Sequence, residues 1–297
     1  MSGKLKEIQE RIKAVTDTEQ ITKAMKMVAA VKLRRAQEAI IEMRPYANRL
    51  KAILADVLPA AQGEVSISLA EQRDPKNIVF LLITSSRGLC GAFNSSLIKL
   101  TNRTITEEYA EQAKNNNVRI ICIGKKGYDF FKKTDFDIVS DHLDLINELS
   151  FDKSIEIVEG LIEDFTEKRT DEVRLVYSQF QNAATQVFVN EQFLPLQKLV
   201  IDEGGEKSEN HDYIFEPNTE QIMIDLVPYI LKAQFYKALL DSHASEHGAR
   251  MTAMDKATEN ANDLIKELRL TFNRARQEEV TSEILEIVGG ANALENA

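Results

Sequence analysis

Two glycine-containing turns are the first places in this sequence where chemistry could occur, because glycine lets the backbone approach a phosphate closely. The segment SSRGLCGAFN (85–94) follows a predicted strand and precedes a predicted helix, where a dinucleotide-binding fold would hold its phosphates. Gly88 and Gly91 lack the GxGxxG spacing, however, and the chain has no GxxxxGK(S/T) motif. Gly124 and Gly127, in ICIGKKGYDFF (121–131), fit a tight strand-to-helix turn. We therefore expect both turns to be structural and predict no bound ATP or NAD.

The other candidates for catalysis or metal binding are four histidines and two cysteines. Only His243 and His247 have the i, i+4 spacing with which two imidazoles can share a metal ion on one helix face. The residues between them do not form an HExxH motif, so we expect a partly exposed pair on a helix. Cys90 and Cys122 have no CxxC spacing, and we expect both thiols to be buried. We predict no catalytic site, no metal site and no cofactor.

Composition excludes several classes of protein. A net charge of −10 and a pI near 5.1 argue against a nucleic-acid binder, which needs clustered basic residues to displace counterions from phosphates. No segment approaches the roughly 18 uncharged apolar residues that span a bilayer, and the N-terminus lacks the features of a secretory signal. We expect the protein to stay in the compartment where it is made. Membrane association would then require a partner, without direct insertion into the bilayer.

The two ends of the chain have the pattern of long helices. Residues 4–62 contain no glycine and carry apolar residues at helical spacing, with Pro45 predicting a kink or local break. Residues 218–288 contain one glycine, Gly248, and keep the same period through Pro228, which predicts a bend. We divide the chain into a helix over 1–62, a central domain over 70–215 and a second helix over 216–297.

The central domain alternates short apolar runs with amphipathic segments. We predict strands at 77–84, 118–124, 136–140 and 173–180, and helices at 95–115, 125–133 and 151–168. This alternation is typical of a parallel, three-layer α/β domain with Rossmann-like topology. The polar segment 201–212 is predicted to be a surface loop.

The lengths of the two terminal helices predict how they are arranged relative to the central domain. A helix of about 70 residues is about 105 Å long, whereas a domain of about 150 residues is on the order of 40 Å across. The helices therefore extend beyond the domain, and we expect them to form an antiparallel coiled coil in which the second helix is the longer. Its unpaired end, EILEIVGGANAL (283–294), is largely apolar, so we expect another protein to enclose it.

Charge is concentrated in the first helix. Residues 1–35 carry nine basic and four acidic side chains. Any single lysine there is compatible with an ordinary solvated face. As a cluster they fit an acidic partner better; its members are Lys23, Lys26, Lys32, Arg34 and Arg35.

Several motifs in this sequence resemble the gamma subunits of F-type ATP synthases. The segment VTSEILEIVGGANA (280–293) is similar to the C-terminal signature of that family. The segment 249–277 looks like its ARM, LIKEL and ARQ blocks, and TEQITKAMKMVAAVKLRRAQ (18–37) looks like its N-terminal helix. RPYA (44–47) and RGLCG (87–91) also fit, so the resemblance spans the whole chain.

The resemblance implies a rotor shaft that couples rotation of a membrane ring to the catalytic beta subunits, with the ATP sites on beta. It implies alpha, beta and epsilon subunits and the c-ring as partners. It also implies a peripheral position on the cytoplasmic face of a bacterial inner membrane, with protons as the coupling ion. Contacts with beta would be made, by resemblance, by Lys23, Met25, Lys26, Arg87, Cys90, Arg276, Gln277, Thr281 and Glu283.

Two other functions compete with this interpretation. A structural coiled-coil adaptor with an α/β docking module would share the long helices, but it should keep strict heptads to its end. This sequence is expected to break its heptads and finishes apolar. A nucleotide-dependent enzyme would need the phosphate loop that is missing.

Overall fold

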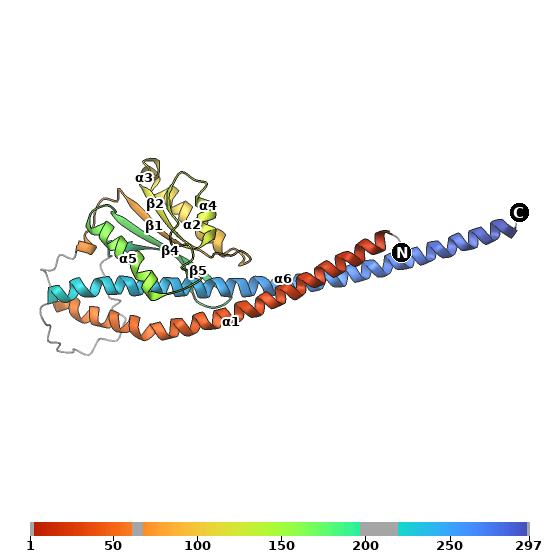
Figure 1. Ribbon diagram of the computed structural model, residues 1–297, viewed down its shortest axis with the longest axis horizontal. Helices are drawn as coiled ribbons and strands as arrows, with labels where there is room; N and C mark the ends of the chain where they lie inside the picture. Colours follow the sequence, from red (N-terminus) through yellow and green to blue (C-terminus); the bar gives the residue numbers. More distant parts are fainter. Residues whose placement is uncertain (1–2, 61–67, 197–218, 296–297) are drawn as a thin grey trace. The chain divides into compact units, whose positions relative to one another are not determined.

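The computed structural model describes residues 3–60, 68–196 and 219–295 (Figure 1). It divides into two compact units. We call them the sheet unit (Ala30–Arg250) and the coiled-coil unit (Met1–Ala29 with Met251–Ala297). Two helices contribute to both, α1 (Gly3–Ala60) and α6 (Thr219–Glu295). The boundaries predicted at residues 62, 215 and 216, and the predicted loop at 201–212, lie outside the described residues.

A five-stranded sheet in the order β3-β2-β1-β4-β5 forms the centre of the sheet unit. β1 (Ile78–Ile83), β2 (Val118–Ile123), β3 (Asp137–Val139) and β4 (Glu172–Phe180) are parallel, which confirms the four predicted strands. β5 (Gln186–Leu194) was not predicted, and it pairs with β4 in antiparallel orientation. The sheet is therefore mixed, and the expectation of a wholly parallel sheet was wrong.

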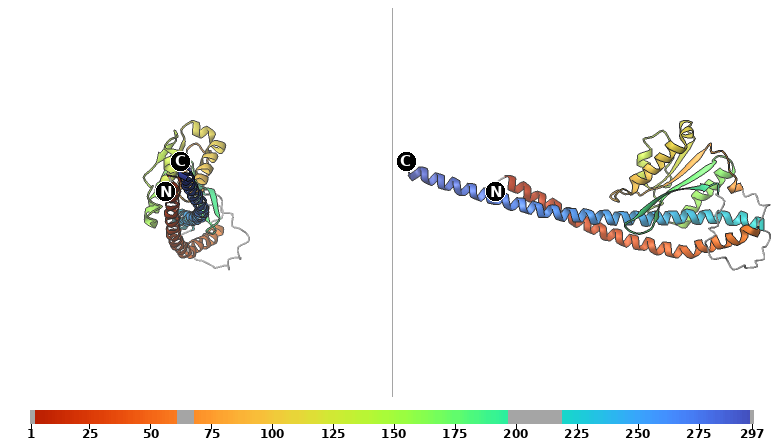
Figure 2. Two further views of the ribbon diagram at one scale, coloured as in Figure 1. Left: turned by 90° about the vertical axis from the view of Figure 1, so that its right-hand side faces the viewer. Right: turned by 180° about the vertical axis from the view of Figure 1, so that it is seen from behind.

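Helices cover both faces of the sheet, which confirms the three-layer α/β fold (Figure 2). One face packs against α2 (Phe93–Glu108) and α4 (Lys125–Phe131). The other packs against α5 (Phe151–Thr166) and the first part of α6. The segment predicted as one helix over 95–115 is interrupted at Tyr109, after which α3 (Ala110–Lys114) follows. A short 3-10 helix, η1 (Ser68–Ala70), precedes β1.

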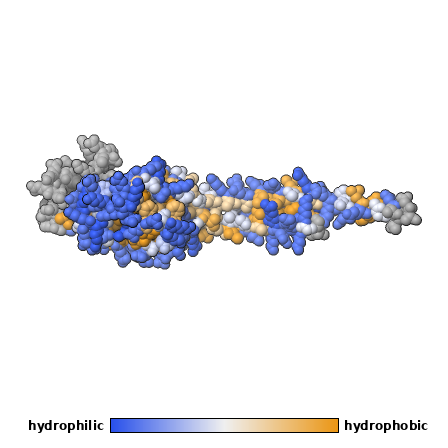
Figure 3. Space-filling view, turned by 90° about the horizontal axis from the view of Figure 1, so that it is seen from above, coloured by the Kyte–Doolittle hydropathy of each residue, from blue (hydrophilic) through white to orange (hydrophobic). Residues whose placement is uncertain are grey.

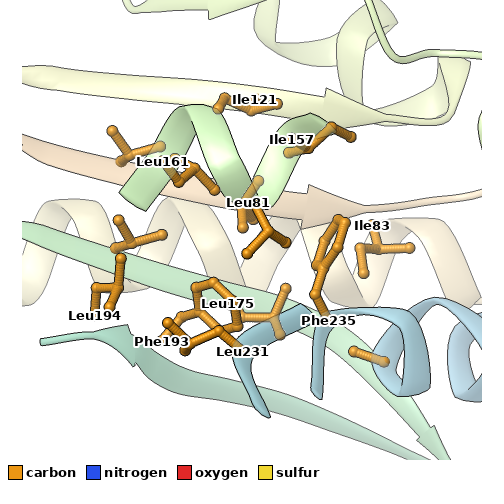
Figure 4. Packing of buried hydrophobic residues seen from close by; sticks show 14 of the residues in the cluster. Leu81, Ile83, Ile121, Ile157, Leu161, Leu175, Phe193, Leu194, Leu231 and Phe235 are labelled. Carbon is orange, nitrogen blue, oxygen red and sulfur yellow. The ribbon is translucent and has the colours of Figure 1, made fainter. Parts of the chain in front are cut away.

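Aliphatic and aromatic side chains from four strands and two helices (β1, β2, β4, β5, α5 and α6) meet on the α5 and α6 face (Figure 4). Because successive residues of a strand point to opposite faces, β1 contributes every second residue to this cluster and the others to the opposite one. The labelled members are Leu81, Ile83, Ile121, Ile157, Leu161, Leu175, Phe193, Leu194, Leu231 and Phe235. Burial on both faces explains why the sequence of β1 is an uninterrupted apolar run.

Helix α6 is also hydrogen-bonded to the backbone of β4. Pairing between β1 and β4 ends at Leu82 and Val176, so one edge of β4 has no strand partner beyond that point. The Ser242 hydroxyl accepts from the Ser178 backbone N–H at 3.0 Å, and the Ser245 hydroxyl donates to the Ser178 carbonyl at 3.3 Å. Two serines on consecutive turns of α6 thus satisfy backbone groups that would otherwise be buried and unpaired.

Neither predicted helix breaker interrupts its helix. Pro45 lies inside α1 and Pro228 inside α6, so the chain does not break at Pro45, while the alternative of a kink there and the bend at Pro228 stay predictions. Proline removes one backbone donor, and a helix that is otherwise packed tolerates that loss. None of the described helices contains a stretch long and apolar enough to cross a membrane.

The coiled-coil unit is antiparallel, as predicted. Lys26 pairs with Asp255, while Lys4, earlier in α1, pairs with Glu278, later in α6. Buried or half-buried side chains recur at alternating spacings of three and four residues on both helices, which is the spacing of a coiled-coil seam. On α1 they are Leu5, Ile8, Ile12, Val15, Glu19, Thr22, Lys26 and Ala29, and on α6 they are Met254, Thr258, Ala261, Ile265, Leu268, Phe272, Ala275 and Glu279.

Strict apolar heptads are nevertheless broken in this part of the chain, as the sequence predicted. Polar residues occupy three consecutive seam positions of α1, namely Glu19, Thr22 and Lys26. They interrupt the hydrophobic pattern without interrupting the packing, because Thr22 meets Thr258 and Lys26 meets Asp255 across the seam.

Candidate interaction sites

The turn after β1 forms a compact loop closed by its own side chains. The Ser85 hydroxyl donates to the Arg87 carbonyl at 2.6 Å and accepts from the Asn94 amide at 2.8 Å. The same amide donates to the Cys90 sulfur at 3.2 Å. Leu89 and Gly91 have φ of 63° and 61°, in the left-handed region that a sharp reversal requires. The polar side chains of this loop thus bond to one another and to its backbone.

Close packing explains the glycines of the second turn. A Cβ on Gly124 would lie 2.0 Å from the Thr84 carbonyl oxygen, and φ at this residue is 93°. A Cβ on Gly127 would lie 3.1 Å from the Thr84 hydroxyl oxygen, which accepts the backbone N–H of Gly127 at 2.9 Å. The second turn therefore needs glycine at these two positions to pack against Thr84.

A buried arginine fastens the first loop to α6. Arg250 is 8% exposed, and its Nη2 donates to the carbonyl oxygens of Arg87 at 3.1 Å and Gly88 at 3.3 Å. Its Nη1 forms an ion pair with Glu246 at 2.6 Å, one helical turn earlier. The sequence interpretation placed neither Arg250 nor Glu246 in a site. Their i, i+4 spacing was the available signal, but it is equally typical of a solvated helix face.

Two histidines complete this network, and their hydrogen bonds fix their tautomers. Because arginine has no acceptor, the His247 Nδ1, 3.3 Å from Arg250 Nη1, must accept. Neutral His247 then carries its proton on Nε2, which donates to the His243 Nε2 at 3.1 Å. His247 is 4% exposed, so the expectation of a partly exposed pair was wrong for it. The described residues contain no cluster of three or more His, Cys, Asp or Glu that could hold a metal ion.

Burial controls the ionisation of this network. It lowers the pKa of His247 to about 3, with further contributions from His243, Arg250 and Lys32. Burial also lowers the pKa of His243 to about 4, aided by Lys32 and Arg250. The pKa of the Glu246 carboxyl is raised by burial, against the opposing effect of Arg250. Both imidazoles are therefore neutral at pH 7, as the hydrogen-bond directions require.

The structure separates the predicted contact residues by exposure. Arg87 is exposed, whereas Cys90 is only 2% exposed, so its thiol supports the loop from inside and does not lie on the surface. Both cysteines are buried, as predicted, and burial raises the pKa of each thiol. Lys23 is exposed and Met25 half-buried, while Lys26 is held in the ion pair with Asp255. Arg34 pairs with Glu38 on its own helix.

The predicted contacts at the end of α6 are all on the surface. They are Arg276, Gln277, Thr281 and Glu283. The Thr281 hydroxyl donates to the Gln277 carbonyl within the helix at 2.8 Å. Large apolar side chains are exposed beside them, namely Val280, Ile284, Leu285, Ile287 and Val288. Hydrophobic atoms recur between hydrophilic ones along the right-hand part of Figure 3.

Comparisons with known proteins agree over the whole chain. The family model described as ATP synthase matches residues 4–294. The ATP synthase gamma chain of Cytophaga hutchinsonii is 46% identical over 292 residues, covering 98% of this chain and 99% of the relative. That of Flavobacterium johnsoniae is 48% identical over 291 residues, covering 98% of each.

Solved structures show the same fold. A chain from the central stalk and c-ring of the Tetrahymena thermophila mitochondrial ATP synthase has a TM-score of 0.56 at 25% identity, covering 80% of this chain and 99% of that one. A chain of the Euglena gracilis mitochondrial ATP synthase has a TM-score of 0.65 at 22% identity, covering 98% and 95%. With a full-length family match and relatives well above 40% identity, this chain belongs to the ATP synthase gamma chain family.

Proposed function

We propose that this chain is the rotor of the central stalk in an F-type ATP synthase. In this role it couples rotation of a membrane c-ring to the conformational cycle of catalytic beta subunits, which is a mechanical bias on states of different affinity. The proposal places the catalytic sites on beta, and it assigns neither a catalytic site nor a cofactor to the described residues of this chain. The exposed apolar end of α6 is the observation that best supports this role.

Helix α6 continues past the end of its coiled-coil partner. Glu279 is its last sheltered seam residue, and every residue from Val280 to Asn292 is exposed. The five large apolar side chains named above are 48% to 71% exposed. At 100° per residue they occupy an arc of about 160° around the helix. An apolar surface this broad on a single helix is stable in water only inside a partner, as in a sleeve formed by alpha and beta subunits.

Residues around the two helices and the Arg87 loop are proposed to contact beta. The exposed ones are Lys23, Arg87, Arg276, Gln277, Thr281 and Glu283, with half-buried Met25 beside them. Lys26 is assigned mainly to the pair with Asp255, and Cys90 to supporting the loop. Epsilon and the c-ring are proposed partners of the complex. The chain is then a peripheral protein on the cytoplasmic face of a bacterial inner membrane, with protons as the coupling ion.

A coiled-coil adaptor remains the second candidate, because the heptad seam over Leu5–Ala29 fits it equally well. The two functions differ in partners. Co-expression of the tagged chain with alpha, beta and epsilon subunits is expected to yield a complex that hydrolyses ATP. A chain that purifies alone as a soluble monomer would contradict the rotor function.

A matched pair of substitutions sharpens this experiment. Ile287→Glu places a charge within the apolar arc, whereas Ser282→Glu places the same charge outside it. Because burying an unpaired carboxylate costs several kcal/mol, Ile287→Glu is expected to weaken assembly at least about tenfold. Ser282→Glu is expected to change it much less. Equal effects of the two variants would show that the apolar arc does not seat in the partner.

A further inference from the structure

The loop after β1 presents two exposed side chains on a fixed base. Arg87 is exposed, and Leu89 is 64% exposed, although large apolar residues are usually buried. Leu89 has a φ of 63°, a conformation that residues with a Cβ disfavour. A free loop would relax from it, so contacts at the base must hold it.

Arg250 supplies contacts at that base. Its guanidinium reaches the two carbonyl groups that precede Leu89, those of Arg87 and Gly88. Glu246 orients the guanidinium from the same helix through the other terminal nitrogen. Because its guanidinium is fixed by Glu246 and donates to two loop carbonyls, buried Arg250 connects α6 rigidly to the loop.

We propose that Arg250 is a positioning residue that locks the loop at residues 85–91 onto α6, so that Arg87 and Leu89 are held ready to contact a partner. The partner is the catalytic beta subunit, and that part of the inference rests on the proposed function. The lock itself does not, because all its contacts lie within one unit of this chain.

Arginine is required because one group must serve four acceptors, namely Glu246, His247 and the two loop carbonyls. Its planar fork directs Nη1 to Glu246 while Nη2 meets both carbonyls. Lysine keeps the positive charge beside Glu246 but offers a single ammonium on a more flexible stem. Arg250→Lys should therefore preserve the ion pair and weaken the hold on the loop.

Two cysteines provide a direct readout of this lock. Cys90 belongs to the loop, its side chain is buried, and its sulfur becomes reachable to solvent when the loop detaches from α6. Cys122 is fully buried in β2 and becomes reachable only when the sheet opens. The full-length chain is pulsed with iodoacetamide, and peptide mass spectrometry then measures alkylation of each cysteine separately. Cys90 thus reports local opening, and Cys122 reports global unfolding.

Arg73→Lys is the matched control. Arg73 is also a largely buried arginine that pairs with an acid, Glu71, and donates to a carbonyl, that of Phe165 at 3.1 Å. We expect Arg250→Lys to speed alkylation of Cys90 at least about tenfold, because charged hydrogen bonds to the loop are lost. Alkylation of Cys122 should be unchanged, and Arg73→Lys should leave both rates near wild type.

Two results would overturn the lock. The first is a rate of Cys90 alkylation that is the same in Arg250→Lys as in wild type. The second is an equal rise at Cys90 and Cys122, which would mean that Arg250 only stabilises the fold.

A second arm tests the partner. In the complex reconstituted with alpha, beta and epsilon in c-ring-containing vesicles, Arg250→Lys should assemble normally but pump fewer protons per ATP hydrolysed than Arg73→Lys. Normal pumping despite rapid Cys90 alkylation would overturn the inferred use of the loop while leaving the lock in place. Failure of the wild-type chain to assemble would instead contradict the proposed function.

Discussion

The hydroxyl oxygens of Thr22 and Thr258 lie 2.8 Å apart and join α1 to α6 inside the coiled-coil unit. Each hydroxyl also lies within donating distance of a carbonyl of its own helix, that of Glu19 for Thr22 at 3.0 Å and that of Met254 for Thr258 at 2.8 Å, and either one can donate across the seam. A polar pair in a coiled-coil seam fixes the register of the two helices at some cost in stability.

We predict a measurable coupling between these two threonines. In a double-mutant cycle with Thr22→Val and Thr258→Val, the coupling free energy should be about 0.5 to 1.5 kcal/mol, the usual net value of a hydrogen bond. Valine keeps the size of threonine, so packing changes little. Urea unfolding of the full-length chain measures the four stabilities. Strictly additive effects would show that the pair does not hold the helices together.

Lys23 and Lys26 should respond differently to charge reversal. Lys26→Glu places a carboxylate beside Asp255 and should destabilise the chain, by under about 1 kcal/mol because the pair is largely exposed. Lys23→Glu should leave stability unchanged but reduce ATP-driven proton pumping at low salt. Added salt should reduce that difference from wild type, because it screens exposed charges over about 8 to 10 Å.

Lys13→Glu is the control for this comparison, since it makes the same charge change at another exposed position of α1. If Lys23→Glu and Lys13→Glu pump equally well at low salt, Lys23 belongs to an ordinary solvated face.

Acid should destabilise the sheet unit through its histidine pair. The folded-state pKa values of about 4 for His243 and about 3 for His247 lie below the unfolded value of about 6.5. The unfolded chain therefore binds more protons between these limits, and stability falls as the pH drops from about 6.5 towards 4. The raised pKa of Glu246 acts in the opposite direction and offsets part of this loss.

The double variant His243→Gln with His247→Gln should reduce the change of the free energy of unfolding with pH. Glutamine keeps an acceptor for Arg250 and does not titrate. Chemical unfolding at several pH values measures the slope, with His142→Gln as a control outside the pair. A slope unchanged by the double variant would contradict this origin of the acid sensitivity.

Two helical glycines should respond oppositely to substitution. A Cβ on Gly248 would lie 3.2 Å from the Ala183 backbone, whereas nothing lies within 4 Å of one on Gly160. Gly160→Ala should stabilise the chain by about 0.5 to 1 kcal/mol, because alanine has the higher helix propensity. Gly248→Val should destabilise it by about 1 to 3 kcal/mol through overpacking. Thermal unfolding compares the two, and a stabilised Gly248→Val would contradict the close approach of α6 to Ala183.

The strands buried on both faces could be predicted because their apolar runs are continuous. β5 could not, since most of its residues are only half-buried and polar side chains interrupt its pattern at the sheet edge. Pro45 predicted a kink or a local break, and α1 continues through it without a break.

The contact residues proposed from the sequence rest on motif resemblance, and the structure shows that most of them are exposed. The exposed residues of α6 and the loop after β1 follow from the motif resemblance. Arg250 could not be found, because its burial depends on a loop 163 residues away along the chain. Charged residues on a helix are normally solvated, and no local pattern distinguishes the exception.

The two serine bonds between α6 and β4 restrict rotation of the helix about its own axis. Ser242 and Ser245 grip the two backbone groups of one strand residue, Ser178, from consecutive turns. The helix cannot roll without breaking both bonds and driving Gly248 against the backbone of Ala183. A twist applied to the sheet is thus transmitted to α6 through hydrogen bonds between serine side chains and the strand backbone, as well as through side-chain packing.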